Sequence, residues 1–168
     1  MIDNMSKKKV QKTNAMRYLD RCKVNYDVHT YEHKDTDPVD GIHVCQMLGQ
    51  DPVNVFKTLV TQANTKEFIV FMLPVAEELD LKKCAKVAGV KHVEMIHVKD
   101  INKITGYIRG GCSPLGMKKQ FRTFIDKSAF EQAHIFFSGG KIGTQIEMDP
   151  HDLIKVIPME AADLITDH

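Results

Sequence analysis

The feature that most constrains the fold is a pair of apolar segments, residues 55–62 (VFKTLVTQ) and 67–74 (EFIVFMLP). Both are rich in β-branched and aromatic residues, which favour strands. The residues between them, Ala63-Asn64-Thr65-Lys66, are typical of a turn. We therefore expect two strands joined by a short turn as a hairpin.

Local patterns along the rest of the chain predict alternating helices and strands. Apolar residues at helical spacing, with glycine or capping residues at the ends, predict helices over residues 12–22, 39–49, 79–89 and 99–106 and from residue 149. Strand signals predict strands at residues 25–33 and 121–126 and a second hairpin over 134–148 that turns at 138–141. We expect a last strand near 155–157 and a C-terminal helix. The predicted fold is one mixed α/β (α+β) domain with several antiparallel hairpins.

Composition restricts the class of protein. With 168 residues, 43% hydrophobic and 27% charged, the chain suits one globular domain, which we expect to span 12–168 after a frayed N-terminus at 1–11. Its formal net charge of +1 argues against an arm that coats DNA or RNA. No apolar run approaches a membrane span, and the polar N-terminus does not resemble a signal peptide. The four cysteines form no CxxC pair, which favours reduced thiols and a cytoplasmic protein.

The densest cluster of glycine and proline lies at residues 107–116, YIRGGCSPLG, just before the cations Lys118, Lys119 and Arg122. It lacks the G-x-x-x-x-G-K-[ST] pattern and follows no predicted strand, so a nucleotide-binding P-loop or dinucleotide fingerprint is disfavoured. Its backbone N–H groups could face an ester carbonyl, an adenosine or a phosphate. A purely structural glycine-rich turn explains the same pattern.

Other candidate functional residues are ambiguous from spacing alone. His29 and His33 are four apart, but their segment alternates like a strand and offers no third ligand, so we expect no metal site. Cys112 lies in the glycine-rich segment without a nearby histidine as base, which favours a structural role over a nucleophilic one. Lys57 and Thr58 fall on opposite faces of a predicted strand, and alternation does not decide which face borders a site.

Five segments together resemble the YbaK/EbsC family of free-standing aminoacyl-tRNA deacylases, related to the editing domain of bacterial prolyl-tRNA synthetase. They occur in order over most of the domain: HTYEH (29–33), VFKTLV (55–60), LPVAEELDLKKCAKVAG (73–89), VEMIHVKDINKITGYIRGGCSPLG (93–116) and SGGKIGTQIE (138–147). The combination of K-T, T-G-Y-x-x-G-G-x-S-P-x-G and G-G-x-x-G-x-x-I-E is specific. Within the family, the chain looks closest to the Cys-tRNA(Pro) deacylase branch.

The resemblance implies a closed or nearly closed mixed sheet with a site in a cleft, and no cofactor or metal. It implies catalytic roles for Lys57, Gly110 and Gly111, and substrate-binding roles for Tyr31, Thr58, Tyr107, Ser113, Pro114 and Gln145. The implied partners are mischarged aminoacyl-tRNA(Pro) and prolyl-tRNA synthetase, with no membrane and no DNA. Two positions depart from the family pattern: Cys112 replaces an aliphatic or small residue, and Gln145 replaces an acidic one.

The resemblance also implies a reaction. In this branch the thiol of the esterified cysteine attacks its own ester carbonyl, and the enzyme supplies positioning and oxyanion stabilisation. Cys-tRNA(Cys) is a further implied substrate. Two alternatives stay open: a deacylase that clears Ala-tRNA(Pro) with water, and a non-catalytic module that holds nucleotide or tRNA ends. The intact Lys57-Thr58 pair argues against the module, whereas Gln145 leaves it open.

Overall fold

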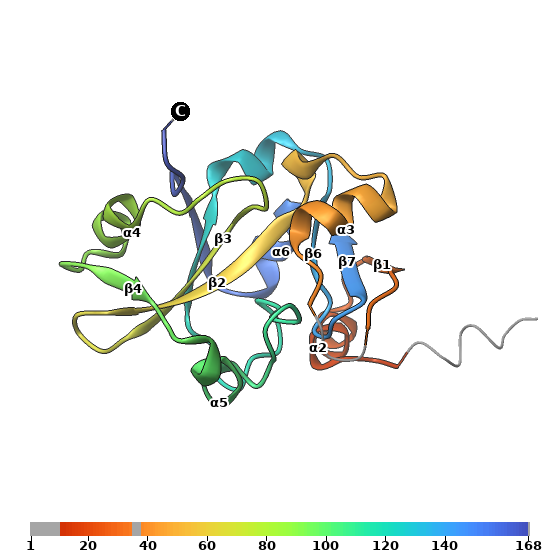
Figure 1. Ribbon diagram of the computed structural model, residues 1–168, viewed down its shortest axis with the longest axis horizontal. Helices are drawn as coiled ribbons and strands as arrows, with labels where there is room; N and C mark the ends of the chain where they lie inside the picture. Colours follow the sequence, from red (N-terminus) through yellow and green to blue (C-terminus); the bar gives the residue numbers. More distant parts are fainter. Residues whose placement is uncertain (1–10, 35–37, 168) are drawn as a thin grey trace, which may run out of the picture.

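The computed structural model describes residues 11–34 and 38–167. Strands form a three-stranded and a five-stranded sheet (Figure 1). The small sheet has the order β1 (Asp27–Thr30), β7 (Thr144–Met148), β6 (Ile135–Ser138). The large sheet has the order β4 (Val93–Met95), β2 (Phe56–Ala63), β3 (Phe68–Pro74), β5 (Arg122–Asp126), β8 (Met159–Ala162). Around them lie α2 (Asn14–Cys22), α3 (Gly41–Leu48), α4 (Leu81–Ala88), α5 (Ile101–Thr105) and α6 (Pro150–Val156), with the 3₁₀ turns η1 (Pro52–Asn54), η2 (Val98–Asp100) and η3 (Lys127–Glu131).

Both expected hairpins are present. Strands β2 and β3 pair antiparallel from Phe56 opposite Pro74 to Gln62 opposite Phe68. Strands β6 and β7 pair antiparallel as well, and β1 joins the other edge of β7. The large sheet is mixed, because β3 pairs with β5 and β5 with β8 in parallel. The mixed α+β fold class is therefore confirmed.

The helices expected over residues 12–22, 39–49, 79–89 and 99–106 and from residue 149 are present, with starts one or two residues later than expected. Asp40, Asp80 and Asp149 cap α3, α4 and α6 through side-chain bonds to backbone N–H groups in the first turn. Gly49 and Gly89 end α3 and α4 in the left-handed conformation, with φ of 66° and 73°. Glycine adopts this conformation without the steric cost that other residues incur.

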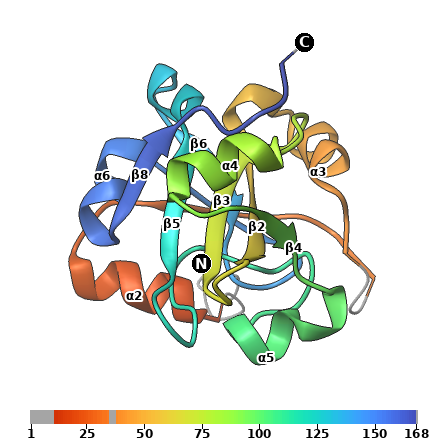
Figure 2. The ribbon, with the colours of Figure 1, turned by 90° about the vertical axis from the view of Figure 1, so that its left-hand side faces the viewer.

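The large sheet separates two hydrophobic clusters. On one face, Phe71 and Phe124 pack beneath α4, which Figure 2 shows in front of β3. On the other face, Met72 and Ile125 meet α2, α6 and the core-facing side of the small sheet. Alternating residues of β3 thus serve opposite layers, as the period-two geometry of a strand requires.

Four expectations about the fold are wrong or fall outside the described residues. The sheets do not close into a barrel, because within the described residues the backbone pairing between them is limited to an isolated bridge between Val55 and Phe136. Residues 155–157 are not a strand: the capped helix α6 continues to Val156, and the last strand follows at β8 after Pro158. Residues 163–167 form no helix. The frayed N-terminus was expected at residues 1–11, and all but Gln11 lie outside the described part of the chain.

No helix in the described residues has both the length and the apolar character needed to cross a bilayer.

Candidate functional site

A cavity of about 310 Å³ lies between α3, residues 56–60 of β2, the small sheet and the segment that follows β4. Its size is at the lower end of small-molecule sites. Its lining is mostly apolar and comes from several separate regions of the chain: Tyr31, Val39, Gly41, Val44, residues 55–60, Val75, Met95, Ile96, Val98, Ile101, Arg109, Gly110, Cys112, Phe137, Ser138, Thr144 and Gln145.

Strand β2 explains why both Lys57 and Thr58 line the cavity. Strand β4 pairs with β2 only at residues 61–63, so the outer edge of residues 56–60 borders the cavity instead of another strand of the large sheet. Consecutive residues on a free edge reach the same space, although their side chains point to opposite faces. Lys57 and Thr58 are thus brought together at the cavity wall.

Lys57 and Thr58 both offer polar groups to a ligand. The Lys57 ammonium lies 3.3 Å from the Val75 carbonyl oxygen and is half-buried. Burial lowers the pKa of Lys57, against a smaller upward effect of Glu78 and Glu77. The Thr58 hydroxyl is buried and has no hydrogen-bond partner among the described residues. Because buried hydroxyls are normally bonded, this group is available to a bound molecule.

The glycine-rich segment forms a wall whose glycines are required by protein packing. The Gly111 N–H donates to the Ile108 carbonyl at 2.9 Å, and Gly110 has φ of +84°, as in a type II turn. A Cβ on Gly110 would lie 2.5 Å from Cβ of Pro38, and one on Gly111 would lie 2.9 Å from Cα of Lys141. The segment is therefore pressed against neighbouring backbone.

Only part of the expected glycine-loop site borders the cavity. Gly110 lines it, whereas Gly111, Ser113 and Pro114 are buried and do not. Ser113 accepts a weak bond of 3.4 Å from the Leu115 N–H within its own loop. These three residues support the wall from behind, and a direct role in catalysis or binding stays a prediction.

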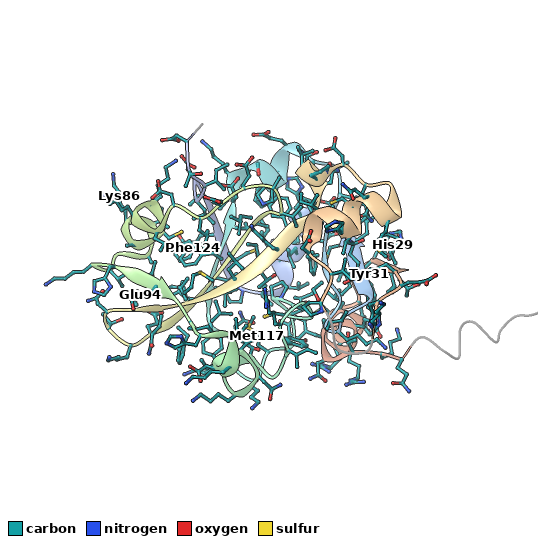
Figure 3. The ribbon with its side chains drawn as sticks, in the orientation of Figure 1. His29, Tyr31, Lys86, Glu94, Met117 and Phe124 are labelled. Carbon is teal, nitrogen blue, oxygen red and sulfur yellow. The ribbon has the colours of Figure 1, made fainter. Side chains whose placement is uncertain are left out.

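The two tyrosines expected at the site differ in position. Tyr31 lines the cavity and lies beside the small sheet near His29 (Figure 3). Tyr107 is buried, does not line the cavity, and donates its hydroxyl to the Leu115 carbonyl. Burial raises the pKa of Tyr107 to about 12. Its position braces the glycine-rich segment.

Gln145 lines the cavity but is only 3% exposed, and its side-chain amide is paired with that of Gln50. Gln145 therefore presents a neutral amide, already hydrogen-bonded within the protein, at the position where the family pattern has an acidic residue.

Cys112 lines the cavity without the environment of a nucleophile. Burial raises the pKa of its thiol to about 12, with a smaller opposing effect of a hydrogen bond to Thr105. No histidine, aspartate or glutamate is among the described residues of the lining. A thiol in such surroundings is largely protonated at neutral pH.

Several lining residues were not anticipated as site residues. Arg109 lies at the tip of the turn and is exposed. Met95 and Val98 line the cavity and are 45% and 56% exposed. Two exposed apolar residues beside a cavity indicate a contact surface. In the sequence, Met95 ends a three-residue edge strand and Val98 follows it, and so short a strand carries no clear pattern.

The histidine pair is not assembled into a metal site. His29 Nε2 lies 2.7 Å from Oε1 of Glu147, and His134 Nδ1 lies 2.8 Å from the other carboxylate oxygen, Oε2. Within residues 11–34 and 38–167 no group of three or more His, Cys, Asp and Glu side chains has a metal-binding arrangement. All four cysteines are free thiols.

Comparison with known proteins gives consistent matches. The family of aminoacyl-tRNA editing domains matches residues 37–156. The chain is 44% identical over 163 residues to EbsC of Enterococcus faecalis, named as a candidate Cys-tRNA(Pro)/Cys-tRNA(Cys) deacylase, and the match covers 96% of this chain and 99% of that protein. It is 25% identical over 145 residues to a proline–tRNA ligase of Brachyspira hyodysenteriae, covering 86% of this chain but 24% of the ligase.

A solved structure extends the likeness to the fold. The crystal structure of a candidate trans-editing enzyme for prolyl-tRNA synthetase superposes with a TM-score of 0.80 at 18% identity, covering 94% of this chain and 100% of the other. The family match extends over most of the chain, and the EbsC match is close and nearly complete. The chain therefore belongs to the family of aminoacyl-tRNA editing domains.

Proposed function

We propose that this protein is a deacylase that removes cysteine from mischarged Cys-tRNA(Pro), and also acts on Cys-tRNA(Cys). The observation that carries the proposal is the near full-length 44% identity to EbsC, whose name gives these substrates. The cavity supports it, because a small, mostly apolar space with a cation and an unpartnered hydroxyl suits an aminoacyl ester.

The residues at the cavity suit stabilisation of negative charge. When an ester carbonyl is attacked, its oxygen becomes an oxyanion. The half-buried ammonium of Lys57 and the Thr58 hydroxyl are donors held by a rigid strand in a mostly apolar wall, where such interactions are stronger than in water. We assign Lys57 the main catalytic role and Thr58 a binding role.

The nucleophile in this proposal is the thiol of the substrate cysteine. Its sulfur forms a bond to its own ester carbonyl carbon, the ester C–O bond breaks, and the proton lost by the thiol is matched by the proton gained by the tRNA hydroxyl. The products are free tRNA and a four-membered thiolactone, which water opens to cysteine. The absence of a lining histidine or carboxylate in the described chain, and the high pKa of Cys112, support a mechanism without a protein nucleophile.

The net charge of this chain is too small to provide strong binding to a particular tRNA. With a net charge of +1, we expect weak binding to tRNA alone, since phosphate contacts dominate such affinity. We propose that prolyl-tRNA synthetase supplies tRNA(Pro) as a partner. The 25% identity to part of a proline–tRNA ligase is consistent with a shared editing role. We place this activity in the cytoplasm, on a single domain spanning 12–168.

A deacylation assay tests the proposal directly. Purified protein is incubated with Cys-tRNA(Pro), Ala-tRNA(Pro) and Pro-tRNA(Pro), and the remaining ester is measured over time. We expect rapid loss of the cysteine ester and little loss of the other two, with the Lys57→Ala variant as a control for contaminating activity. Faster loss of the alanine ester would instead identify a water-using alanine deacylase. No loss of any ester would identify a binding module.

A further inference from the structure

Within the described part of the chain, the charged side chains that line the cavity are all positive. Among its described lining residues, Lys57 and Arg109 are cationic, and none is aspartate or glutamate. Lys57 is half-buried in the wall, whereas Arg109 is exposed. A cavity with one cation inside and one at its edge favours a ligand with two separate sites of negative or developing negative charge.

Arg109 occupies a rigid position. It is the second residue of the turn that is closed by the bond from the Gly111 N–H to the Ile108 carbonyl. Gly110 and Gly111 leave no room for side chains against Pro38 and the backbone of Lys141. The turn is therefore fixed at two points, and the base of the Arg109 side chain is fixed with it.

The guanidinium of Arg109 is not committed to the protein. It makes no hydrogen bond, ion pair or ring contact with any residue that the structure describes, unlike Arg17, Arg21 and Arg122, which have partners. A guanidinium presents several N–H donors in a fork that matches the oxygens of a phosphate.

Another part of the same cavity lining is apolar. Met95 and Val98 are exposed apolar side chains in the lining, and Ile96 and Ile101 adjoin them. Such a surface suits the flat face of a nucleobase, which gains from apolar contact but needs no specific partner. An aminoacylated nucleotide combines these features: a base, a sugar esterified at one hydroxyl, and a phosphate on another hydroxyl.

We propose that Arg109 forms a phosphate subsite at the mouth of the cavity, which binds the 5′-phosphate of the nucleoside that carries the aminoacyl ester. The ester then reaches Lys57 and Thr58, and the base lies on the Met95–Val98 surface. This inference rests on the proposed function, because it takes an aminoacylated nucleoside as the ligand. In this proposal Arg109 lets the protein distinguish the aminoacylated end of a nucleic acid, which has the 5′-phosphate, from a free aminoacyl nucleoside, which lacks it.

Two fragments of the same charged tRNA provide the test. Nuclease P1 releases cysteinyl adenosine with its 5′-phosphate, and ribonuclease A releases cysteinyl adenosine without it. The kcat/KM of each fragment is measured for wild type, Arg109→Gln, Arg109→Lys and Lys86→Gln. Lys86 is a matched control because it is an exposed cation on α4, at the far end of the molecule from Tyr31 (Figure 3).

In wild type and Lys86→Gln we expect the phosphorylated fragment to be preferred by about 10- to 100-fold, the range of a charge-assisted hydrogen-bonded contact. In Arg109→Gln this preference falls to about one, and Arg109→Lys keeps part of it. An unchanged preference in Arg109→Gln, or no preference in wild type, would overturn the subsite.

A binding measurement separates this inference from the proposed function. Non-hydrolysable amide analogues of the two fragments are titrated into each variant by calorimetry. If wild type cleaves neither ester, the proposed deacylase function fails, but the ratio of the two affinities still reports on Arg109. Loss of affinity for both analogues in Arg109→Gln would show that the residue supports the cavity and does not bind the phosphate.

Discussion

The side-chain amides of Gln50 and Gln145 bind each other twice: Gln50 Nε2 donates to Gln145 Oε1 at 2.7 Å, and Gln145 Nε2 donates to Gln50 Oε1 at 3.0 Å. Gln50 follows the glycine that ends α3, and Gln145 lies in β7. The pair therefore joins α3 to the small sheet at the cavity wall, and it fills a buried position without charge.

We expect Gln50→Ala to destabilise the protein by about 1–3 kcal/mol, because it leaves the buried amide of Gln145 without a partner. Urea denaturation measures the change, with Gln46→Ala on the exposed side of α3 as the matched control. The Gln50→Ala/Gln145→Ala double variant should lose less than the sum of the single variants. Strict additivity would show that the two amides do not support each other.

Lys57→Ala is expected to lower the deacylation rate of Cys-tRNA(Pro) by about 10²–10³-fold, the usual cost of one lost oxyanion partner. Folding should persist, because the half-buried ammonium is costly to desolvate and its removal leaves no buried charge behind. Single-turnover kinetics and thermal denaturation measure the two effects, with Lys86→Ala as control. Activity within a few-fold of wild type in folded Lys57→Ala protein would remove Lys57 from the catalytic site.

Gly111→Val and Cys112→Ala are neighbouring changes with opposite expected outcomes. A side chain at position 111 would meet the backbone of Lys141 and Ile142 at 2.9–3.1 Å, so the glycine-rich segment must shift and activity should be lost. Cys112→Ala removes a protonated thiol that has no catalytic partner, so activity should stay within a few-fold of wild type. Paired rate and circular-dichroism measurements compare them. An inactive but folded Cys112→Ala variant would point to a protein-thiol mechanism.

Replacing the esterified cysteine with serine should slow cleavage strongly. The serine hydroxyl is similar in size but has almost no anionic fraction at neutral pH, whereas a thiol with a pKa of about 8.5 is ionised to a few per cent. The loss also removes the high effective concentration of an intramolecular nucleophile. Single-turnover rates of Ser-tRNA(Pro) and Cys-tRNA(Pro), with enzyme in excess, isolate the chemical step. Equal rates would favour attack by water.

The contact between His134 and Glu147 should stabilise the fold over a limited pH range. The hydrogen bond to Glu147 raises the pKa of His134 above 6.5, so its contribution is complete below that value and is lost as pH rises through the folded pKa. Burial alone would raise the pKa of Glu147, but the bonds from His134 and His29 outweigh it and lower the pKa below 4.5. The contribution of Glu147 is complete above that value and is lost as pH falls through its folded pKa. The pair therefore stabilises most between about pH 4.5 and 6.5.

Urea midpoints of wild type and His134→Ala at pH 5.5 and pH 8 check this expectation. The difference between the two proteins should be larger at pH 5.5, and small in absolute size because His134 is half-exposed. His92→Ala, which changes an exposed histidine elsewhere, is the control. An equal difference at both pH values would show that the interaction does not depend on the protonation of His134.

The sequence by itself determined the features that depend on neighbouring residues. Helix ends followed from Asp149 and from Gly49 and Gly89, because capping interactions involve only neighbouring residues. The two hairpins followed from apolar segments flanking short turns. The motifs also sufficed for the family, since they are specific in combination.

Tertiary structure decided what depends on distant segments. Alternation along β2 did not decide whether Lys57 borders a site. In the fold it does, because β4 pairs with β2 only at residues 61–63 and leaves the edge of residues 56–60 beside the cavity. The glycines at 110 and 111 signalled close contact, but only the fold showed that the contact is with Pro38 and Lys141. We expected a strand near 155–157, yet the capped helix α6 extends through Val156. The position of Arg109 at the cavity mouth likewise required segments far apart in the chain to meet, and no local pattern encodes such a meeting.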